Sequence, residues 1–209
     1  MEIKNIIFDL GGVIIDLDYN RTAAAFKQLG IADFDDIYSK AKQTSLFDDF
    51  EKGWSSDADF RAELRQFLPA ATSDTAIDEA WNAMLLDIPK HRVDWLKKMA
   101  KRYRIFLLSN TNHIHVRSFT TYADHKFGTG AFEKIFEKYY FSCEMGMRKP
   151  DAEIFELVIQ ENNLDKSTTL FIDDSIQHIH GAEKVGIKAE WLNIPEGEKI
   201  ESKYDYLLS

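Results

Sequence analysis

The sequence has a single cysteine, Cys143, among its 209 residues, so no disulfide can form within the chain. It also lacks the Cys and His spacings that are typical of zinc sites. A chain of this length can bury a sizeable hydrophobic core without such covalent or metal crosslinks. Because structural disulfides belong mainly to secreted proteins, their absence favours a reducing compartment, and we expect a cytoplasmic protein.

The sequence contains no apolar run long enough to cross a membrane, and its first residues, MEIKNIIFDLGG, lack the basic and apolar regions of a signal peptide. Basic residues are in the minority, with 26 Lys and Arg against 35 Asp and Glu, for a formal net charge of −9. Because clustered Lys and Arg hold phosphate backbones, this balance argues against a nucleic-acid partner. A small anionic substrate is still compatible with it, since a bound cation can reverse the local field.

Five short apolar runs are typical of strands buried on both faces. The first lies in NIIFDLGGVIID, residues 5–16, and the others are RIFLL at 104–108, KYYF at 138–141, TTLFI at 168–172 and AEWL at 189–192. Between them, apolar residues recur at helical spacing, as in Ile154, Phe155, Val158 and Ile159, or in Val93, Leu96 and Met99. Alternating strands and helices predict an α/β fold, a Rossmann-like parallel sheet with helices on both sides.

Residues 17–95 break this alternation because they show amphipathic helical patterns and no convincing strand. The patterns include Phe60, Leu64 and Phe67, then Trp81, Met84 and Leu85. Ser56, with Asp59 three residues later, is a typical helix start. We therefore expect an α/β core formed by residues 1–16 and 96–209, with a helical insertion at 17–95.

Polar residues stand where three of the predicted strands end. They are Asp9, the pair Ser109 and Asn110, and the pair Asp173 and Asp174. Parallel sheets bind ligands beyond the carboxyl ends of their strands. Each residue taken singly is a common turn or capping residue. Three carboxylates at one edge would however repel, by about 4 kcal/mol for two charges 4 Å apart at an effective dielectric near 20. A cation relieves that repulsion, and oxygen ligands alone favour Mg²⁺.

A further motif, GMRKPDAEIF at 146–155, contains Lys149 before Pro150. Proline is frequent in the first turn of a helix, so we expect Pro150 to lie there. A lysine in such a place is usually a solvated surface residue. Beside a carboxylate cluster, Lys149 would instead be able to hold a phosphate.

Four stretches in order, FDLGGV, LLSNTN, RKPDAEIF and FIDDSIQHIHGAEKVGI, resemble the motifs of the haloacid dehalogenase superfamily of hydrolases. The resemblance covers essentially the whole chain. The longer strings LGGVIIDLDYNR, LSNTNHIH and GMRKP are similar to those of bacterial sugar-phosphate phosphatases, α-glucose-1-phosphate phosphatases in particular. The helical insertion at 17–95 would then be the family's cap domain.

The resemblance implies a Mg²⁺-dependent phosphatase that acts on a small phosphorylated metabolite, such as glucose 1-phosphate. Asp9 would attack phosphorus and form an aspartyl-phosphate, which water later cleaves. Mg²⁺ would lie between Asp9, the carbonyl of Gly11, and Asp173 or Asp174, of which Asp174 is the favoured direct ligand. The phosphoryl group would be bound by Ser109 and Lys149, with Asn110 and Gly12 nearby.

One residue departs from the family's pattern. Most phosphatases of the superfamily carry a second aspartate two residues after the nucleophile, where it protonates the leaving group, and this sequence has Gly11. General acid catalysis contributes about 10²–10⁴-fold to a rate. A substrate with a good leaving group, such as an anomeric phosphate, would suffer least from its loss. Asp16 and Asp18 are candidate substitutes, although turn and solvent-facing roles suit them better.

Several other residues have two interpretations. The strings HIH at 113–115 and 178–180 suggest a metal site, but residues two apart on a helix do not face one another, so we do not expect zinc. His115 follows Ser109 closely and is either a substrate contact or a capping or surface residue. Phe47 and Trp54 either line the substrate pocket or belong to the core.

Two other functions compete with a phosphatase. A 2-haloacid dehalogenase would use the same Asp9 without a metal, which the pair Asp173 and Asp174 disfavours. A catalytically weak binding protein with the same fold has only Gly11 in its support. The sequence does not determine the oligomeric state, and a monomer is compatible with it.

Overall fold

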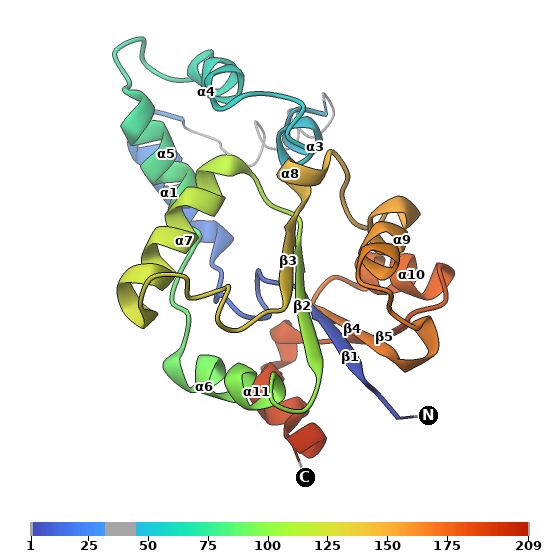
Figure 1. Ribbon diagram of the computed structural model, residues 1–209. Coiled ribbons are helices and arrows are strands. Elements are labelled where there is room, and N and C mark those ends of the chain that lie inside the picture. Colours follow the sequence, from blue (N-terminus) through green and yellow to red (C-terminus); the bar gives the residue numbers. More distant parts are fainter. Residues whose placement is uncertain (1, 32–44, 209) are drawn as a thin grey trace.

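A computed structural model describes residues 2–31 and 45–208 of the chain. Its centre is a five-stranded sheet in the order β3-β2-β1-β4-β5, in which every neighbouring pair is parallel (Figure 1). The strands are β1 (Asn5–Phe8), β2 (Arg104–Ser109), β3 (Lys138–Phe141), β4 (Thr169–Asp173) and β5 (Lys188–Trp191). The predicted α/β fold is confirmed, and its central strand is the first in the sequence.

Helices connect the strands and also form the insertion between β1 and β2. In the insertion lie α1 (Tyr19–Gln28), α3 (Leu46–Glu51), α4 (Asp57–Arg65) and α5 (Asp74–Asn82), followed by α6 (Lys90–Met99). After β2 come α7 (His113–Phe127), α8 (Ser142–Met145), α9 (Ala152–Glu161), α10 (Ile176–Lys184) and α11 (Ile200–Lys203). Short 3-10 helices occupy Lys166–Thr168, Ile194–Glu196 and Asp205–Leu208.

Alternate residues of the central strands pack into two separate hydrophobic clusters, one on each face of the sheet. Ile6 and Phe8 of β1 face the side covered by α6, α7 and α11, whereas Ile7 faces α9 and α10 (Figure 1). The predicted stripes on α6 and α9 are confirmed, since Leu96 and Phe155 are fully buried. Each large apolar side chain buried in this way contributes about 1.5–3 kcal/mol to folding.

The helices α1, α3, α4 and α5 gather above the sheet in Figure 1 and have a hydrophobic cluster of their own. Phe60 of α4 lies at its centre, in ring contact with Phe47, Phe50 and Trp81. Ser56 caps α4 in a reciprocal capping box with Asp59, as the sequence predicts. Within the described residues of this insertion the structure contains no strand, only an isolated bridge between residues 17 and 85. The division at residues 16/17 and 95/96 stays a prediction.

Two expectations about burial are wrong. The fifth strand, β5, is an edge strand with no fully buried residue, so it is not covered on both faces. Phe67 is 45% exposed and lies two residues beyond the end of α4 at Arg65, so the helical pattern does not continue to it. Leu85 lies beyond the end of α5 at Asn82, but it is half-buried and packs against the hydrophobic clusters of the sheet and of the insertion, as the amphipathic pattern predicts.

Among the described helices, none combines the length and the apolar composition that crossing a bilayer requires.

Candidate active site

The carboxyl ends of three adjacent strands bring the predicted residues together. Asp9 directly follows β1, Asp173 is the last residue of β4, and Ser109 is the last residue of β2. The backbone N–H of Asp9 donates to the carbonyl of Ile172, at 2.9 Å, which extends the β1–β4 ladder by one step. The register therefore places Asp9 beside Asp173, although 164 residues separate them in the sequence.

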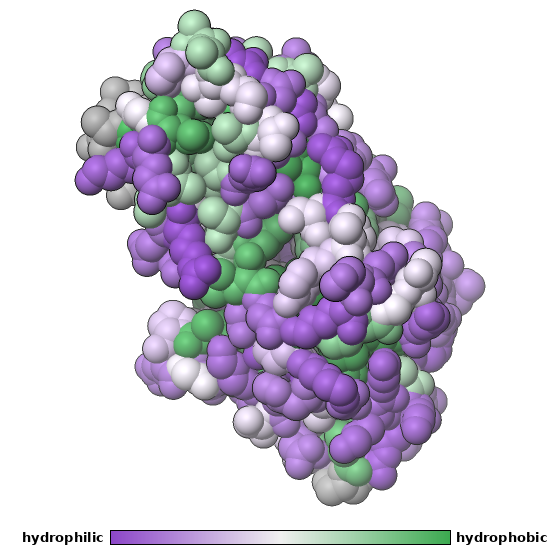
Figure 2. Space-filling model, turned by 90° about the vertical axis from the view of Figure 1, so that its left-hand side faces the viewer, coloured by the Kyte–Doolittle hydropathy of each residue, from purple (hydrophilic) through white to green (hydrophobic). Residues whose placement is uncertain are grey.

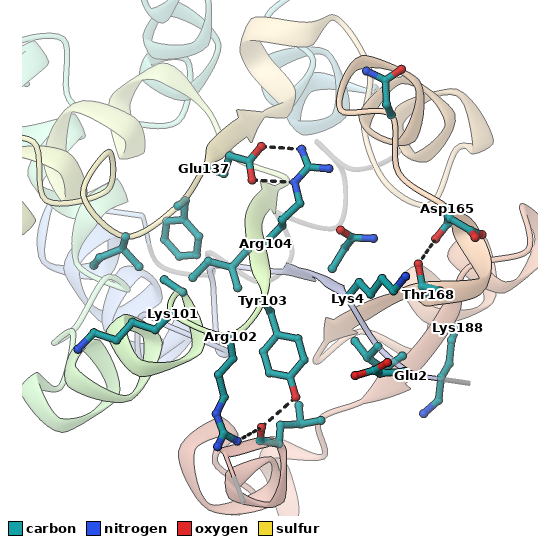
Figure 3. A pocket seen from close by; sticks show the side chains of 18 of the residues that line it. Glu2, Lys4, Lys101, Arg102, Tyr103, Arg104, Glu137, Asp165, Thr168 and Lys188 are labelled. Atoms are coloured by element: carbon teal, nitrogen blue, oxygen red, sulfur yellow. Dashed lines mark hydrogen bonds and ion pairs between the residues drawn. The ribbon is translucent and has the colours of Figure 1, made fainter.

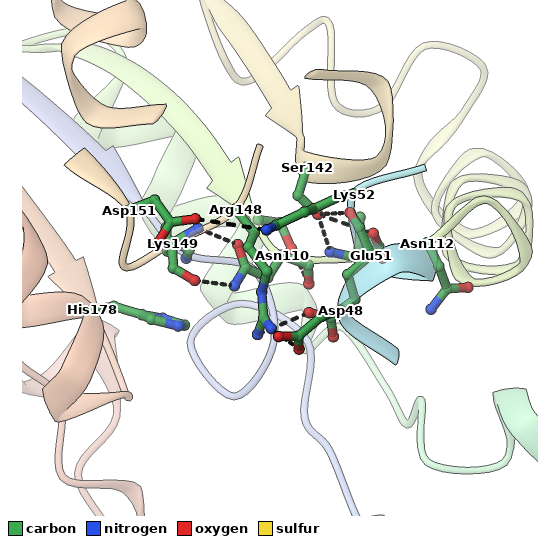
Figure 4. Close-up of polar contacts among 12 residues, drawn as sticks. Asp48, Glu51, Lys52, Asn110, Asn112, Ser142, Arg148, Lys149, Asp151 and His178 are labelled. Carbon is green, nitrogen blue, oxygen red and sulfur yellow. Dashed lines mark hydrogen bonds and ion pairs between the residues drawn. The ribbon is translucent and has the colours of Figure 1, made fainter. Parts of the chain in front are cut away.

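Lys149 is completely buried between these two carboxylates. Its Nζ donates to Asp9 Oδ1 and to Asp173 Oδ2, both at 2.6 Å, and to the carbonyl of Leu108 at 2.8 Å. Asn110 fixes the backbone of Lys149: its Oδ1 accepts from the N–H at 2.9 Å, and its Nδ2 donates to the carbonyl at 2.8 Å (Figure 4). The side chain of Asn110 therefore positions Lys149, and its predicted role in phosphate binding stays a prediction.

The expected position of Pro150 is wrong. The helix α9 begins at Ala152, with Asp151 as its N-cap residue, so Pro150 lies in the turn before the helix. Lys149 therefore lies in a loop. Hydrogen bonds with Asn110 and with the carbonyl of Leu108 hold it at the carboxyl end of the sheet. It is not a charge at a helix N-terminus.

The two carboxylates of the Asp173 and Asp174 pair differ in their surroundings. Asp173 accepts hydrogen bonds from Lys149, from the backbone N–H of Ser175 at 2.7 Å and from His178 Nδ1 at 2.9 Å. No ion pair among the described residues engages Asp174. Asp9, Asp173 and Asp174 each offer one carboxylate oxygen, and these three atoms lie within 4.8 Å of one another.

The carboxyl end of the sheet carries an excess of negative charge, which a divalent cation would neutralise. Burial, with the neighbouring carboxylates, raises the pKa of Asp9 to about 7, against the influence of Lys149. Burial and the charge of Asp173 raise the pKa of Asp174 to about 6. Burial also acts to raise the pKa of Asp173, but Lys149 and His178 outweigh it and lower that pKa to about 2. One lysine therefore does not neutralise three carboxylates, and the all-oxygen donor set fits Mg²⁺.

The glycines after Asp9 leave space for this arrangement. A Cβ on Gly12 would lie 2.4 Å from Asp174 Oδ2, and the φ of Gly12 is +74°, in the left-handed region. The backbone N–H of Gly12 already donates to the carbonyl of Ile15 at 2.8 Å, so a role of that N–H in phosphate binding would need this bond to break. Ser109 is buried, and within the described part of the chain its hydroxyl has only a long contact, 3.4 Å, with the carbonyl of Asn110.

Comparison with known proteins agrees with this geometry. Residues 3–186 match the family model of the haloacid dehalogenase-like hydrolases. The D-ribitol-5-phosphate phosphatase of Bacteroides thetaiotaomicron is 33% identical over 186 residues, which cover 89% of this chain and 90% of that protein. The chain belongs to the haloacid dehalogenase-like hydrolase family.

Solved structures of family members have the same fold. A family enzyme of Bacteroides thetaiotaomicron, in complex with magnesium and inorganic phosphate, matches with a TM-score of 0.87 and 38% identity, covering 97% of this chain and 99% of that one. A predicted haloacid dehalogenase-like hydrolase of Porphyromonas gingivalis matches with a TM-score of 0.86 and 32% identity, covering 100% and 98%. These similarities confirm the predictions of a phosphatase of this family and of Mg²⁺ as its cofactor.

The cavity next to the aspartates has a volume of about 400 Å³. Gly11, Ser109 and Asn110 line it at the sheet, and Glu51, Trp81 and Met84 line it from the insertion. On the face that carries α1, α5 and α7, Figure 2 shows hydrophobic side chains gathered in a hollow. A larger cavity, about 1290 Å³, lies at the opposite end of the sheet, where charged residues such as Lys4 and Arg104 surround it (Figure 3). Because open parallel sheets bind ligands beyond the carboxyl ends of their strands, we assign the chemistry to the smaller cavity.

Of the two roles left open for Phe47 and Trp54, the structure gives Phe47 the role in the core and Trp54 neither. Phe47 is buried in the hydrophobic cluster of the insertion, stacked on Trp81, and Trp54 is 66% exposed under the ammonium of Lys52. His115, for which two roles were open, does line the cavity. Both of its ring nitrogens have partners, Nδ1 at Asn112 and Nε2 at the carbonyl of Trp81.

Sequence reasoning missed three residues near the site. His178, from the second HIH string, contacts Asp173 rather than a metal cluster, because one turn of α10 returns it to the end of β4. Arg148 and Glu51 form an ion pair of 3.0 Å between the loop before α9 and the end of α3 (Figure 4). Arg148 is the first residue of the motif RKPDAEIF, so the motif could have drawn attention to it. No pattern in the helical insertion distinguished Glu51 from its neighbours.

Proposed function

We propose that this protein is a Mg²⁺-dependent phosphomonoester hydrolase that acts on a small sugar or sugar-alcohol phosphate, with Asp9 as the nucleophile. The observation that carries the proposal is the buried Lys149, 2.6 Å from both Asp9 and Asp173, next to a cluster of three carboxylate oxygens within 4.8 Å. This arrangement supplies a carboxylate nucleophile and two kinds of positive charge for a phosphoryl group.

In the first step, a carboxylate oxygen of Asp9 forms a bond to phosphorus while the bond to the leaving-group oxygen breaks. Water then attacks phosphorus, breaks its bond to Asp9 and releases inorganic phosphate. Lys149 stays protonated throughout, since Asp173 and Asp9 raise its pKa against the opposing effect of burial. Ser109, with a hydroxyl that lacks a short hydrogen bond within the described structure, donates to a phosphoryl oxygen.

Asp9, Asp174 and the carbonyl of Gly11 would hold the metal, which supplies charge neutralisation for the phosphoryl group. Asp174 is the better direct ligand of the pair, because Lys149, Ser175 and His178 already occupy both oxygens of Asp173. Asp173 then acts mainly by positioning Lys149. The side chains present thus divide the work between a metal site and a fixed ammonium.

The class of substrate follows from the relatives and the cavity. The curated relative at 33% identity acts on D-ribitol 5-phosphate. A cavity of about 400 Å³ suits a leaving group of sugar size. Ribitol 5-phosphate and the earlier candidate, glucose 1-phosphate, are therefore the first substrates to compare. A cytoplasmic location and a monomeric state stay predictions.

The test is phosphate release from a panel of phosphomonoesters, with Mg²⁺ and with EDTA, by the wild type and by Asp9→Asn. We expect release that depends on Mg²⁺ and is lost in Asp9→Asn. Undiminished turnover in Asp9→Asn would remove the nucleophile from the account. Halide release from a 2-haloacid in the presence of EDTA would support the dehalogenase instead, and no release from any ester would support a binding protein.

A further inference from the structure

Gly11 leaves the family's usual proton-donor position without a side chain, so another group has to protonate a poor leaving group. Such a donor must line the cavity beside Gly11, Ser109 and Asn110, where the leaving group lies during attack by Asp9. Among the described residues that line this cavity, three have a titratable side chain: Glu51, His115 and Tyr19.

His115 and Tyr19 do not suit this role. His115 is buried with both ring nitrogens engaged, and burial lowers its pKa to about 4, so it holds no proton to transfer on a free nitrogen. Tyr19 is 66% exposed. Asp16 and Asp18, the candidates from the sequence, do not line the cavity: Asp16 is paired with Arg92 at 3.0 Å, and Asp18 caps α1.

Glu51 is held over the cavity by contacts from the core. It is the last residue of α3, and its carbonyl accepts a hydrogen bond from Ser142 Oγ at 2.6 Å. The same Oγ accepts from the backbone N–H of Thr111 at 2.9 Å, two residues after Ser109. Glu51 Oε2 is buried and lies 3.0 Å from Arg148 Nη2. No hydrogen bond or ion pair from the described part of the chain holds its other oxygen, while the side chain is 30% exposed.

We propose that Glu51 is the proton donor to the leaving group, in the role that an aspartate at the Gly11 position would otherwise have. The inference rests on the proposed phosphatase function. As the bond from phosphorus to the ester oxygen breaks and the bond to Asp9 forms, the carboxyl proton of Glu51 passes to that ester oxygen. In the second step, the Glu51 carboxylate takes a proton from the attacking water and is ready for the next cycle.

The surroundings of Glu51 suit a group that both gives and regains a proton. Burial raises its pKa, Arg148 opposes that effect, Asp48 on the same helix adds to it, and Lys149 opposes it. Arg148 also pairs with Asp48, so its guanidinium bridges two carboxylates of α3. The guanidinium stabilises the carboxylate that proton transfer leaves behind.

The test compares Glu51→Gln with the wild type on two substrates that differ in the leaving group. Ribitol 5-phosphate releases an alkoxide that needs a proton, whereas p-nitrophenyl phosphate releases a phenolate that does not. We expect kcat/KM for ribitol 5-phosphate to fall by about 10²–10⁴-fold and that for p-nitrophenyl phosphate to stay within about threefold of the wild type. Activity on the second substrate also reports that the variant is folded.

Two further variants separate proton donation from a positional role. Asp49→Asn removes another carboxylate of α3, one whose hydrogen bond is to Ser45, and should leave the ratio of the two kcat/KM values unchanged. Gly11→Asp in the Glu51→Gln background should restore much of the ribitol 5-phosphate activity. Within the described structure, the Cβ of the new side chain would meet the flexible end of Leu17, with Cδ1 at 2.9 Å, and the φ of Gly11 is not in the left-handed region.

Equal losses on both substrates in Glu51→Gln would overturn the inference, and so would a change of ratio in Asp49→Asn. Failure of the proposed function would look different. In that case the wild type would release no phosphate from either substrate, or Asp9→Asn would release it undiminished, whatever residue stands at position 51.

Discussion

Lys149 and Asp9 form a buried contact, with Nζ 2.6 Å from Oδ1, although 140 positions separate them in the sequence. The same ammonium reaches Asp173, so removing it would leave two buried carboxylates without their cation. The lysine therefore has a structural role as well as its role toward the phosphoryl group.

Lys149→Met should lower the free energy of unfolding by about 3–5 kcal/mol, since breaking a buried ion pair leaves an uncompensated charge. Urea unfolding measures this change. The matched control is Lys166→Met, whose pair with Glu156 lies at the surface with side chains 35% and 49% exposed. The control should change the free energy by at most about 1 kcal/mol. Equal effects of the two substitutions would contradict the burial of Lys149.

Gly12→Ala should weaken Mg²⁺ binding, because the added methyl group would displace the Asp174 carboxylate, 2.4 Å from the Cβ position. We expect the Mg²⁺ concentration for half-maximal phosphate release to rise by about 10–100-fold. Gly197→Ala is the control, since Gly197 has a similar φ of +84° but nothing within 4 Å of its Cβ position. Gly197→Ala should introduce similar backbone strain and leave the Mg²⁺ dependence unchanged. Equal shifts in the two variants would show that backbone strain, and not the contact with Asp174, weakens Mg²⁺ binding.

Stability should depend on pH through His115. Burial lowers its pKa from an ordinary 6.5 to about 4 in the folded protein. Between pH 4 and 6.5 the imidazole of His115 therefore binds a proton in the unfolded chain but not in the folded protein, so its contribution to stability rises with pH across this window and is constant above it. Across this window, the contribution of His115 to the free energy of unfolding changes by roughly 3 kcal/mol. The raised pKa values of Asp9 and Asp174 act in the opposite direction, so the contribution of His115 is read from the difference between the wild type and a variant.

Urea unfolding at several pH values between 4 and 7.5 measures this slope in the wild type and in His115→Asn. The variant has no imidazole to titrate, so the slope of its free energy of unfolding against pH should be less positive than that of the wild type, whatever its stability at neutral pH. An unchanged slope in His115→Asn would mean that other groups produce the pH dependence.

The sequence predicts the sheet well because its central strands are continuous apolar runs, which only a buried strand explains. The fifth run, AEWL, looks alike but forms an edge strand, since β-propensity does not reveal whether a neighbouring strand follows. Asp9 and Asp173 were predictable because topology alone brings the ends of parallel strands together. Lys149 lies in a loop, and its place beside them was predicted from the motif that contains it.

The contribution of the insertion was not predictable in the same way. Glu51 meets Arg148 and Ser142 only because the turn at Gly53 packs on the backbone of Cys143, where a Cβ would lie 2.0 Å from the carbonyl oxygen. Such contacts depend on how the helices of the insertion are placed over the sheet, and a single sequence carries no periodic signal for that placement. For the same reason the sequence did not decide between the two roles of Phe47 and Trp54: Phe47 is in the core of the insertion, and Trp54 is exposed.

The most direct test of the account is rapid-quench mass spectrometry during turnover of a phosphomonoester in the presence of Mg²⁺. The account predicts one phosphoryl group on the peptide that contains Asp9, and none in Asp9→Asn or in EDTA. A phosphoryl group on another residue, or full-rate phosphate release by Asp9→Asn, would contradict it.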